Sequence, residues 1–182
     1  MTKRSPDDSW NATTRALHWL MALLILMQAV GGWVIDEMER SPLKVDAMTA
    51  HKSLGITLLL LLLVRLLWRW THTAPPPPQG SKPWEILAAR LSHIALYLLM
   101  IAVPVSGWLS ASTSIVPWKL WWLVPWPRIA GPSKDLHELA EELHEGLIWA
   151  LVAVLALHVT AALYHHFVKH DPVLRRMLRA RP

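Results

Sequence analysis

The sequence contains no cysteine, and few of its residues are charged. Without cysteine the 182-residue chain can form no disulfide, no thiolate metal site, no iron–sulfur cluster and no Cys-x-x-Cys-His attachment site for a covalent c-type haem. Only 17% of its residues are charged, whereas a soluble domain usually carries roughly 25%. These absences exclude several redox cofactors and argue against a soluble fold.

Charged residues are missing altogether from four long stretches of the chain. These stretches, which contain no Lys, Arg, Asp or Glu, are residues 17–35, 53–64, 94–111 and 146–164. A helix needs about 20 mostly apolar residues to cross the hydrocarbon core of a membrane. The second stretch reaches that length only if Arg65 lies at the membrane edge, where its long side chain can extend to water. Four membrane-spanning helices are therefore predicted.

The predicted fold is an all-α, integral membrane four-helix bundle that forms a single domain over residues 1–182. The predicted helices are about 12–36, 47–70, 84–111 and 136–169. Asn11 is placed to cap the first helix and Asp46 to cap the second. The apolar, Trp-rich segment 114–127 is too short and too rich in proline to span, so it is expected to lie flat on the outer surface and cover that end of the bundle.

The basic residues predict an orientation in the membrane. Four spans put both termini on one side, and twelve of the Lys and Arg residues lie near the termini or in residues 65–90, against six in the two opposite loops. The positive-inside rule then places both termini in the cytoplasm. The net charge of +5 does not indicate nucleic-acid binding, because these residues flank apolar spans and form no single patch.

Ten histidines are present, and two of them share one face of the last helix. His144 and His158 are fourteen residues apart, which is within about 40° of four full helical turns and about 21 Å along the axis. His18 opens the first helix at the depth of His158, and His51 opens the second at the depth of His144. The predicted pairs are therefore His18 with His158 and His51 with His144. Two imidazoles per site fit the axial ligands of a low-spin b-type haem, one near each surface.

Other residues lie where they could support the two cofactors. Gly32 and Gly55 could leave room for a flat macrocycle, although small residues also serve ordinary helix packing in membranes. Arg65, fourteen residues after His51 but at cytoplasmic depth, could pair with a haem propionate or simply anchor its helix at the interface. His165 lies nearly on the same helix face as His158 and about 10 Å nearer the cytoplasm, where it could contact a quinone or a propionate. No catalytic side chain is assigned.

Short motifs in all four helices resemble one family. They are, in order along the chain, Arg15…His18-Trp19; His51-x-x-x-Gly55 followed by Arg65 and the proline-rich linker; His93…Leu96-Tyr97…Pro104…Gly107; and Leu143-His144-Glu145, Leu157-His158 and Tyr164-His165-His166-Phe167. Their order and spacing are similar to those of the bacterial cytochrome b561 family, small diheme cytochromes related to the b-type subunits of nickel–iron hydrogenases.

The resemblance implies a bundle in the bacterial inner membrane with haem ligands at His18, His51, His144 and His158. It also implies electron exchange with the quinone pool, and some family members are described as superoxide oxidases that reduce ubiquinone. We therefore expect a membrane electron-transfer protein with two b haems, either an oxidoreductase or a pure electron carrier, acting between a periplasmic donor and ubiquinone. One alternative is a cytochrome subunit of a larger dehydrogenase or hydrogenase. An alternative of another class is a histidine-based proton or metal transporter.

Overall fold

The computed structural model describes residues 9–178, and its regular structure is almost entirely helical. The long helices are α1 (Ala12–Glu37), α2 (Pro42–Thr71), α3 (Pro83–Thr113) and α4 (Lys134–Phe167), followed by the short α5 (Val173–Leu178). Each long helix is long and apolar enough to cross a membrane. The predicted all-α, four-helix membrane fold is thus confirmed.

The starts of the first two helices follow from their capping residues. Asn11 caps α1 through its side chain, as predicted. The second helix begins at Pro42, about five residues earlier than predicted, and its cap is Ser41 rather than Asp46. Serine is a strong N-cap, and proline fits the first helical position because the N–H that it lacks would have no helical partner there. The Ser-Pro pair therefore starts the helix before Asp46 is reached.

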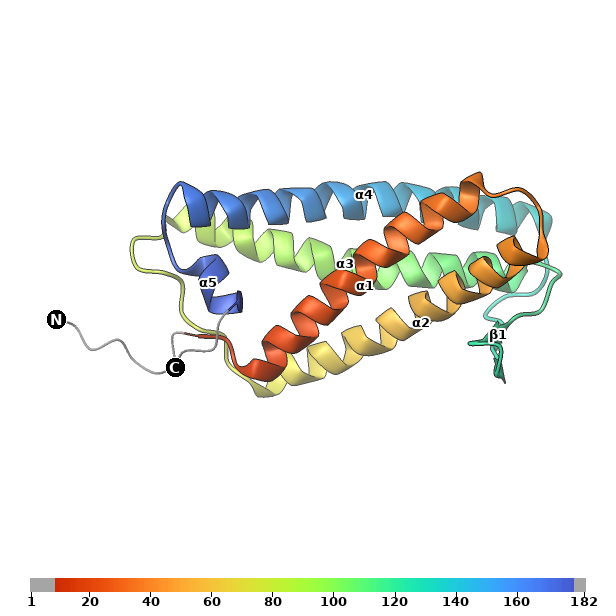
Figure 1. Cartoon of the computed structure of the whole chain (residues 1–182), viewed down its shortest axis with the longest axis horizontal. Helices are drawn as coiled ribbons and strands as arrows, with labels where there is room; N and C mark the ends of the chain where they lie inside the picture. Colours follow the sequence, from red (N-terminus) through yellow and green to blue (C-terminus); the bar gives the residue numbers. More distant parts are fainter. Residues whose placement is uncertain (1–8, 179–182) are drawn as a thin grey trace.

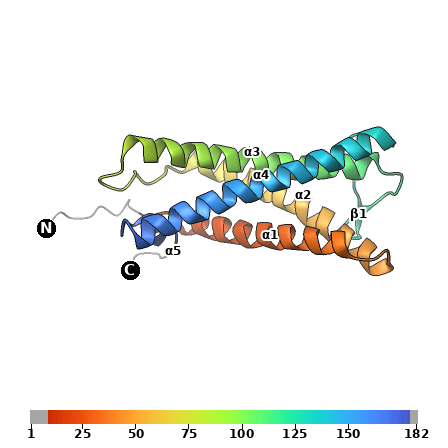
Figure 2. The same cartoon turned by 90° about the horizontal axis from the view of Figure 1, so that it is seen from above.

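The long helices pack as two antiparallel hairpins (Figure 1). Helix α1 packs on α2, α3 packs on α4, and the hairpins meet mainly through α2 and α3. One end of the bundle holds the starts of α1 and α3 and the ends of α2 and α4; we call it the terminal end, because α5 also folds back there beside α1 (Figure 2). The opposite end, which carries a small β-hairpin, is called the hairpin end.

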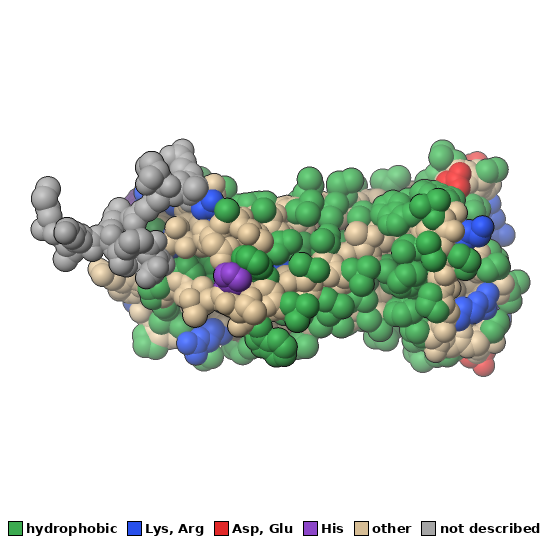
Figure 3. Space-filling view, turned by 90° about the horizontal axis from the view of Figure 1, so that it is seen from below, with side chains coloured by type: hydrophobic (Ala, Val, Ile, Leu, Met, Phe, Trp, Pro, Cys, Tyr) green, Lys and Arg blue, Asp and Glu red, His purple; other side chains and the backbone are tan. Residues whose placement is uncertain are grey.

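The surface of the bundle is apolar in the middle and charged at the ends. Hydrophobic side chains cover the central part of the face seen in Figure 3, and Lys and Arg gather at both ends. Among residues 9–178, only a few apolar side chains, including Met21, Ile56 and Leu62, are buried between the helices. An apolar exterior with so small a core is what a lipid-facing bundle requires, because lipid tails are as apolar as leucine.

The Trp-rich segment differs from the predicted flat cover. It forms a two-stranded antiparallel hairpin of β1 (Lys119–Leu120) and β2 (Val124–Pro125). In the turn, the backbone N–H of Trp121 donates to Ser53 Oγ at 2.8 Å, and its indole N–H donates to Thr57 Oγ1 at 3.1 Å. The hairpin is therefore fastened to the side of α2 instead of lying across the end of the bundle.

Two contacts tie the terminal end together. The ammonium of Lys169 donates to both carboxylate oxygens of Glu85 at 2.7 Å, which joins the end of α4 to the start of α3. These hydrogen bonds raise the pKa of Lys169 above its usual value. The indole of Trp19 donates to the carbonyl of Met177 at 2.9 Å, and this bond holds α5 against α1.

Candidate functional site

At the terminal end, His18 of α1 and His158 of α4 face each other. Their ring centroids are 6.4 Å apart, and the ring planes are inclined by 61°. A metal–imidazole bond of about 2 Å, plus about 1.1 Å from nitrogen to ring centre, puts two rings on opposite sides of one metal about 6 Å apart. The centroid separation is therefore close to that of two imidazoles that share a metal, and His18 with His158 is the pairing predicted from the sequence.

A third histidine joins this pair. His93 of α3 lies with its ring centroid 5.4 Å from that of His158. His93 thus lies closer to His158 than His18 does, and the structure brings three histidines together at this end. The sequence had left His93 unassigned. The signal that could have found it is the motif from His93 to Gly107, which the family resemblance includes without giving His93 a role.

Arg65 reaches the same site from α2. Its guanidinium lies 3.3 Å from Nδ1 of His18, and its Nε lies 3.5 Å from the hydroxyl of Tyr97. Arginine can only donate hydrogen bonds, so Nδ1 of His18 is the acceptor in this arrangement. A metal bound at the other ring nitrogen would leave the proton on Nδ1. Metal binding by His18 through Nε2 therefore requires Arg65 to turn to another acceptor.

The second predicted pair lies at the hairpin end. His51 of α2 and His144 of α4 are within electrostatic range of each other. Each ring rests directly on a glycine of a neighbouring helix. A Cβ added to Gly32 would lie 3.0 Å from Cε1 of His51, and one added to Gly107 would lie 2.9 Å from Cε1 of His144. Both glycines therefore make room for a histidine ring.

Gly55, in contrast, makes room for an amide. A Cβ at this position would lie 3.3 Å from Nε2 of Gln28, which donates to the backbone carbonyl of His51 at 2.7 Å. The space at Gly55 thus serves the packing of α1 on α2, which is the ordinary small-residue function. Gln28 had not been singled out from the sequence, where a lone Gln in an apolar run carries no pattern.

The donor set fits a haem better than a free metal ion. Each site offers two neutral imidazoles from two helices, and a porphyrin supplies the other four nitrogen ligands itself. A free Zn²⁺ ion would need three or four protein ligands. No group of three or more His, Cys, Asp or Glu side chains converges to hold a metal within residues 9–178. In the same range, Nδ1 of His51 is buried without a hydrogen-bond partner, so the protein around it leaves the polar capacity of this ring unused.

A cavity of about 80 Å³ opens beside the terminal-end histidines. Its lining includes Arg65, Trp68, His93 and Tyr97, and Met177 of α5 closes one side. His165, which the sequence suggested for this region, does not line the cavity. Its Nδ1 is paired with the carboxylate of Asp171, just after α4, and its side chain is mostly buried.

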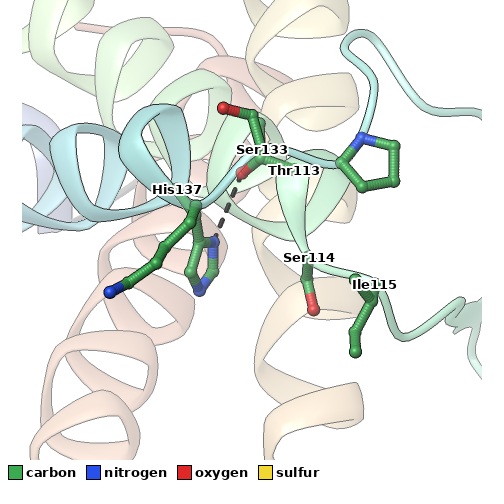
Figure 4. Close-up of a pocket in the computed structure, with 7 residues that line it drawn as sticks. Thr113, Ser114, Ile115, Ser133 and His137 are labelled. Atoms are coloured by element: carbon green, nitrogen blue, oxygen red, sulfur yellow. Dashed lines mark hydrogen bonds between the residues drawn. The ribbon is translucent and has the colours of Figure 1, made fainter.

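A larger hollow of about 420 Å³ lies at the rim of the hairpin end, where α3 stops and α4 starts (Figure 4). His137 lines it together with Thr113 and Ser133. Nδ1 of His137 lies 2.9 Å from the carbonyl of Ser110 and 3.3 Å from Oγ1 of Thr113. His137 therefore fastens the end of α3 to the start of α4, and none of the candidate ligands lines this hollow.

Comparison with known proteins places the chain among membrane cytochromes. The family model for prokaryotic cytochrome b561 matches residues 9–180. Cytochrome b561 homolog 2 of Escherichia coli (strain K12) is 32% identical over 179 residues, which cover 98% of this chain and 95% of the relative. A protein named probable superoxide oxidase CybB, from Yersinia pestis, is 29% identical, with 89% of this chain and 91% of the relative covered. Cytochrome b562 of Cereibacter sphaeroides is 30% identical over 91% of this chain and 92% of its own length.

Proposed function

Because the chain belongs to the prokaryotic cytochrome b561 family of membrane cytochromes with b-type haem, we propose that it holds two b haems and carries electrons across a bacterial inner membrane. The observation that carries this proposal is the placement of two histidine pairs at opposite ends of the bundle. His144 and His158 are separated by about 21 Å along α4, and the rings of His18 and His158 lie 6.4 Å apart.

Haem supplies one-electron chemistry at a potential that its surroundings adjust. The residues of this chain hold, orient and shield it. His18 with His158, and His51 with His144, would hold the two haems, and Gly32 and Gly107 let two of these rings approach a neighbouring helix. Two histidines that both bind the same haem would leave no open position for oxygen. Electron transfer is therefore favoured over oxygen activation.

Arg65 is the proposed partner of a haem propionate at the terminal end. It must leave His18 Nδ1 when His18 binds a metal through Nε2, and a carboxylate is a stronger acceptor for a guanidinium than a neutral ring. Tyr97, 3.5 Å from Arg65 Nε, lies on the same side and can hold the guanidinium there. His165, whose Nδ1 is already bound by Asp171, is the weaker candidate for this contact.

Ubiquinone is the proposed electron acceptor, reduced at the terminal end. The cavity beside His93 and Tyr97 supports this assignment, since it offers polar groups next to the candidate haem site. His165 remains a proposed quinone contact, at the rim where α4 ends. With the positive-inside orientation, this end faces the cytoplasm, which supplies the protons that quinone reduction consumes.

The proposed electron donor reaches the protein at the hairpin end, which faces the periplasm in this orientation. Superoxide is a small anion, and one relative is named a probable superoxide oxidase. Lys52 follows His51 directly, and Lys119 is exposed on β1 of the hairpin. These two cations can attract an anion to this end. Arg128 is engaged otherwise, because its guanidinium donates to the carbonyls of Ser112 and Ile115 and so holds the loop.

The test is spectroscopic and then kinetic. A reduced-minus-oxidised spectrum of the purified chain, with a pyridine haemochrome count of two haems per chain, is the expected result. A count of one or none contradicts the two-haem proposal. Reduction of ubiquinone by the chain when superoxide is generated is expected next. If superoxide fails to reduce a correctly loaded chain, the donor assignment fails, and a cytochrome subunit of a larger dehydrogenase or hydrogenase becomes the better interpretation.

A further inference from the structure

His144 is held by a hydrogen-bonding site on α3, formed by Val103 and Ser106. Helix α3 supplies none of the proposed ligands. Nδ1 of His144 lies 2.9 Å from the carbonyl oxygen of Val103 and 2.9 Å from Oγ of Ser106. Oγ of Ser106 itself donates to the same carbonyl at 2.8 Å. Ser106 is 4% exposed, so water competes little for these bonds.

The partners determine where the proton of His144 lies. A backbone carbonyl can only accept a hydrogen bond, so Nδ1 of His144 must be the donor. The hydroxyl hydrogen of Ser106 is directed to the carbonyl of Val103, which leaves an oxygen lone pair to accept from the same Nδ1–H. His144 is therefore fixed with its proton on Nδ1 and its lone pair on Nε2, the form that binds a metal through Nε2.

The position of the ring is fixed as well. A Cβ at Gly107 would stand 2.9 Å from Cε1 of His144, closer than real Cβ atoms approach other atoms, so the ring lies directly against the backbone of α3. The same short segment of α3 thus provides a carbonyl, a hydroxyl and a bare backbone surface for one imidazole.

Two of the other candidate ligands have no comparable hydrogen-bond acceptor for Nδ1. Nδ1 of His51 is buried without a hydrogen-bond partner in the described part of the chain, and Nδ1 of His18 faces the guanidinium of Arg65, a donor. The hydrogen-bonding site on α3 therefore distinguishes His144 from His18 and also from His51, its proposed partner on the same haem.

We propose that Ser106 is a positioning residue for His144, which holds the ligand proton on Nδ1 and thereby lowers the redox potential of the haem at the hairpin end. The inference rests on the proposed function. A ligating histidine that donates its other N–H to an acceptor becomes a more basic ligand, which favours the ferric state. At the terminal end the guanidinium of Arg65 acts in the opposite direction, because a nearby cation favours the ferrous state. The two surroundings together favour electron flow from the hairpin end to the terminal end.

The experiment is a spectroelectrochemical titration of the haem-loaded, full-length chain and its variants. Ser106→Ala is expected to raise the midpoint potential of one haem, the one that His144→Ala removes, and to leave the other potential unchanged. The electron paramagnetic resonance signal of that haem should shift too, since it reports ring orientation. Ser106→Thr keeps the hydroxyl and should restore the wild-type potential. Ser110→Ala is the matched control, because Ser110 lies one turn further along α3 and contacts His137.

Unchanged potentials and spectra in Ser106→Ala, or an equal shift of both haems, would overturn the inference. If that variant does not fold, Ser106→Cys decides, because the thiol is of similar size and a weaker acceptor, so a smaller rise is expected and no rise contradicts the inference. The two proposals fail separately. A wild-type chain with a single haem that depends on His144 and responds to Ser106 contradicts only the two-haem proposal, whereas two haems with no response to Ser106 contradict only this inference.

Discussion

Gly32 of α1 supports the ring of His51 of α2 so closely that a Cβ at residue 32 would lie 3.0 Å from Cε1 of that ring. A Cβ at Gly31, its neighbour in the chain, would have no atom from elsewhere in the described residues within 4 Å. The two glycines are therefore a matched pair. One is required by the contact with His51, and the other faces open space.

The first prediction compares Gly32→Ala with Gly31→Ala. The methyl group at residue 32 should displace His51 and lower the haem content by about one haem per chain, because bis-imidazole ligation needs both rings in place. Gly31→Ala should keep the wild-type content and be neutral or slightly stabilising, since alanine is about 1 kcal/mol better than glycine in a helix. Pyridine haemochrome counts and the reduced spectrum measure both. Equal haem contents in the two variants would show that the close contact is without consequence.

The second prediction concerns the pairing of ligands. His18→Ala and His158→Ala should each remove the terminal-end haem, and His51→Ala and His144→Ala the other, because each change removes one of the two residues that would hold that haem. A double variant that combines both members of one pair should therefore retain one intact bis-histidine spectrum. A double variant with one member from each pair should retain none. An intact bis-histidine haem in His51→Ala/His158→Ala protein would refute the pairing.

The third prediction is for Arg65→Gln. Loss of a cation beside one haem should lower that midpoint potential, since the guanidinium favours the ferrous state. Each kcal/mol of lost interaction corresponds to about 40 mV for a one-electron couple, so a fall of several tens of millivolts is expected. Arg65→Lys keeps the charge and should fall less. If both variants leave both potentials unchanged, Arg65 lies away from the haem and serves only as an interfacial anchor.

The large features of this fold follow from the sequence because they depend on composition and period. Four charge-free stretches require four spanning helices, and the fourteen-residue spacing of His144 and His158 requires one helix face. Both inferences rest on hydropathy and on helix geometry, which do not need tertiary contacts. The structure accordingly places His18 opposite His158, as depth alone had suggested.

The remaining features depend on contacts between helices, which a single sequence does not encode locally. Asp46 looked like a helix cap but lies inside α2, where its carboxylate accepts the indole N–H of Trp122 from the β-hairpin. Gly55 faces Gln28, and the partner of Gly107 is a histidine 37 positions later in the chain. Rotation of each helix about its axis decides these contacts, and that rotation is set by packing of whole surfaces.

The fourth prediction tests the quinone end. Tyr97→Phe removes the hydroxyl next to Arg65 at the wall of the cavity, and His165→Leu removes the ring that Asp171 holds. If the quinone headgroup binds in the cavity, Tyr97→Phe should slow ubiquinone reduction by the prereduced chain more than His165→Leu does, with unchanged haem spectra in both. His166→Leu is the control for the second variant, because Nδ1 of His166 is buried without a partner in the described residues and its loss breaks no bond.

A larger effect of His165→Leu would instead assign the headgroup contact to the end of α4. Normal rates in both variants would exclude this whole region as the quinone site. In each case the haem spectra must remain unchanged, because a shifted spectrum would mean that the variant acts through the haem rather than through the quinone.

The last prediction concerns charge steering of superoxide at the hairpin end. A cleft or surface with one sign of charge concentrates ions of the opposite sign and raises their association rate, and salt screens this effect with a Debye length of about 8 Å at physiological ionic strength. Lys52 and Lys119 are the cations placed to act. Lys134 serves as the single-charge comparison; its ammonium is 3.6 Å from the carboxylate of Glu138, and both side chains are mostly exposed.

The rate of haem reduction by superoxide should therefore fall several-fold as salt rises, and Lys52→Gln/Lys119→Gln protein should be slow at low salt already. Lys134→Gln should slow the reaction less than the double change, because it removes one positive charge instead of two. Arg128→Gln is not an equivalent test, because it would also break the hydrogen bonds to Ser112 and Ile115 that hold the loop. A fast, salt-independent rate that survives the double change would mean that superoxide reaches the haem without help from these two lysines, and its entry would then depend on the shape of the hairpin end alone.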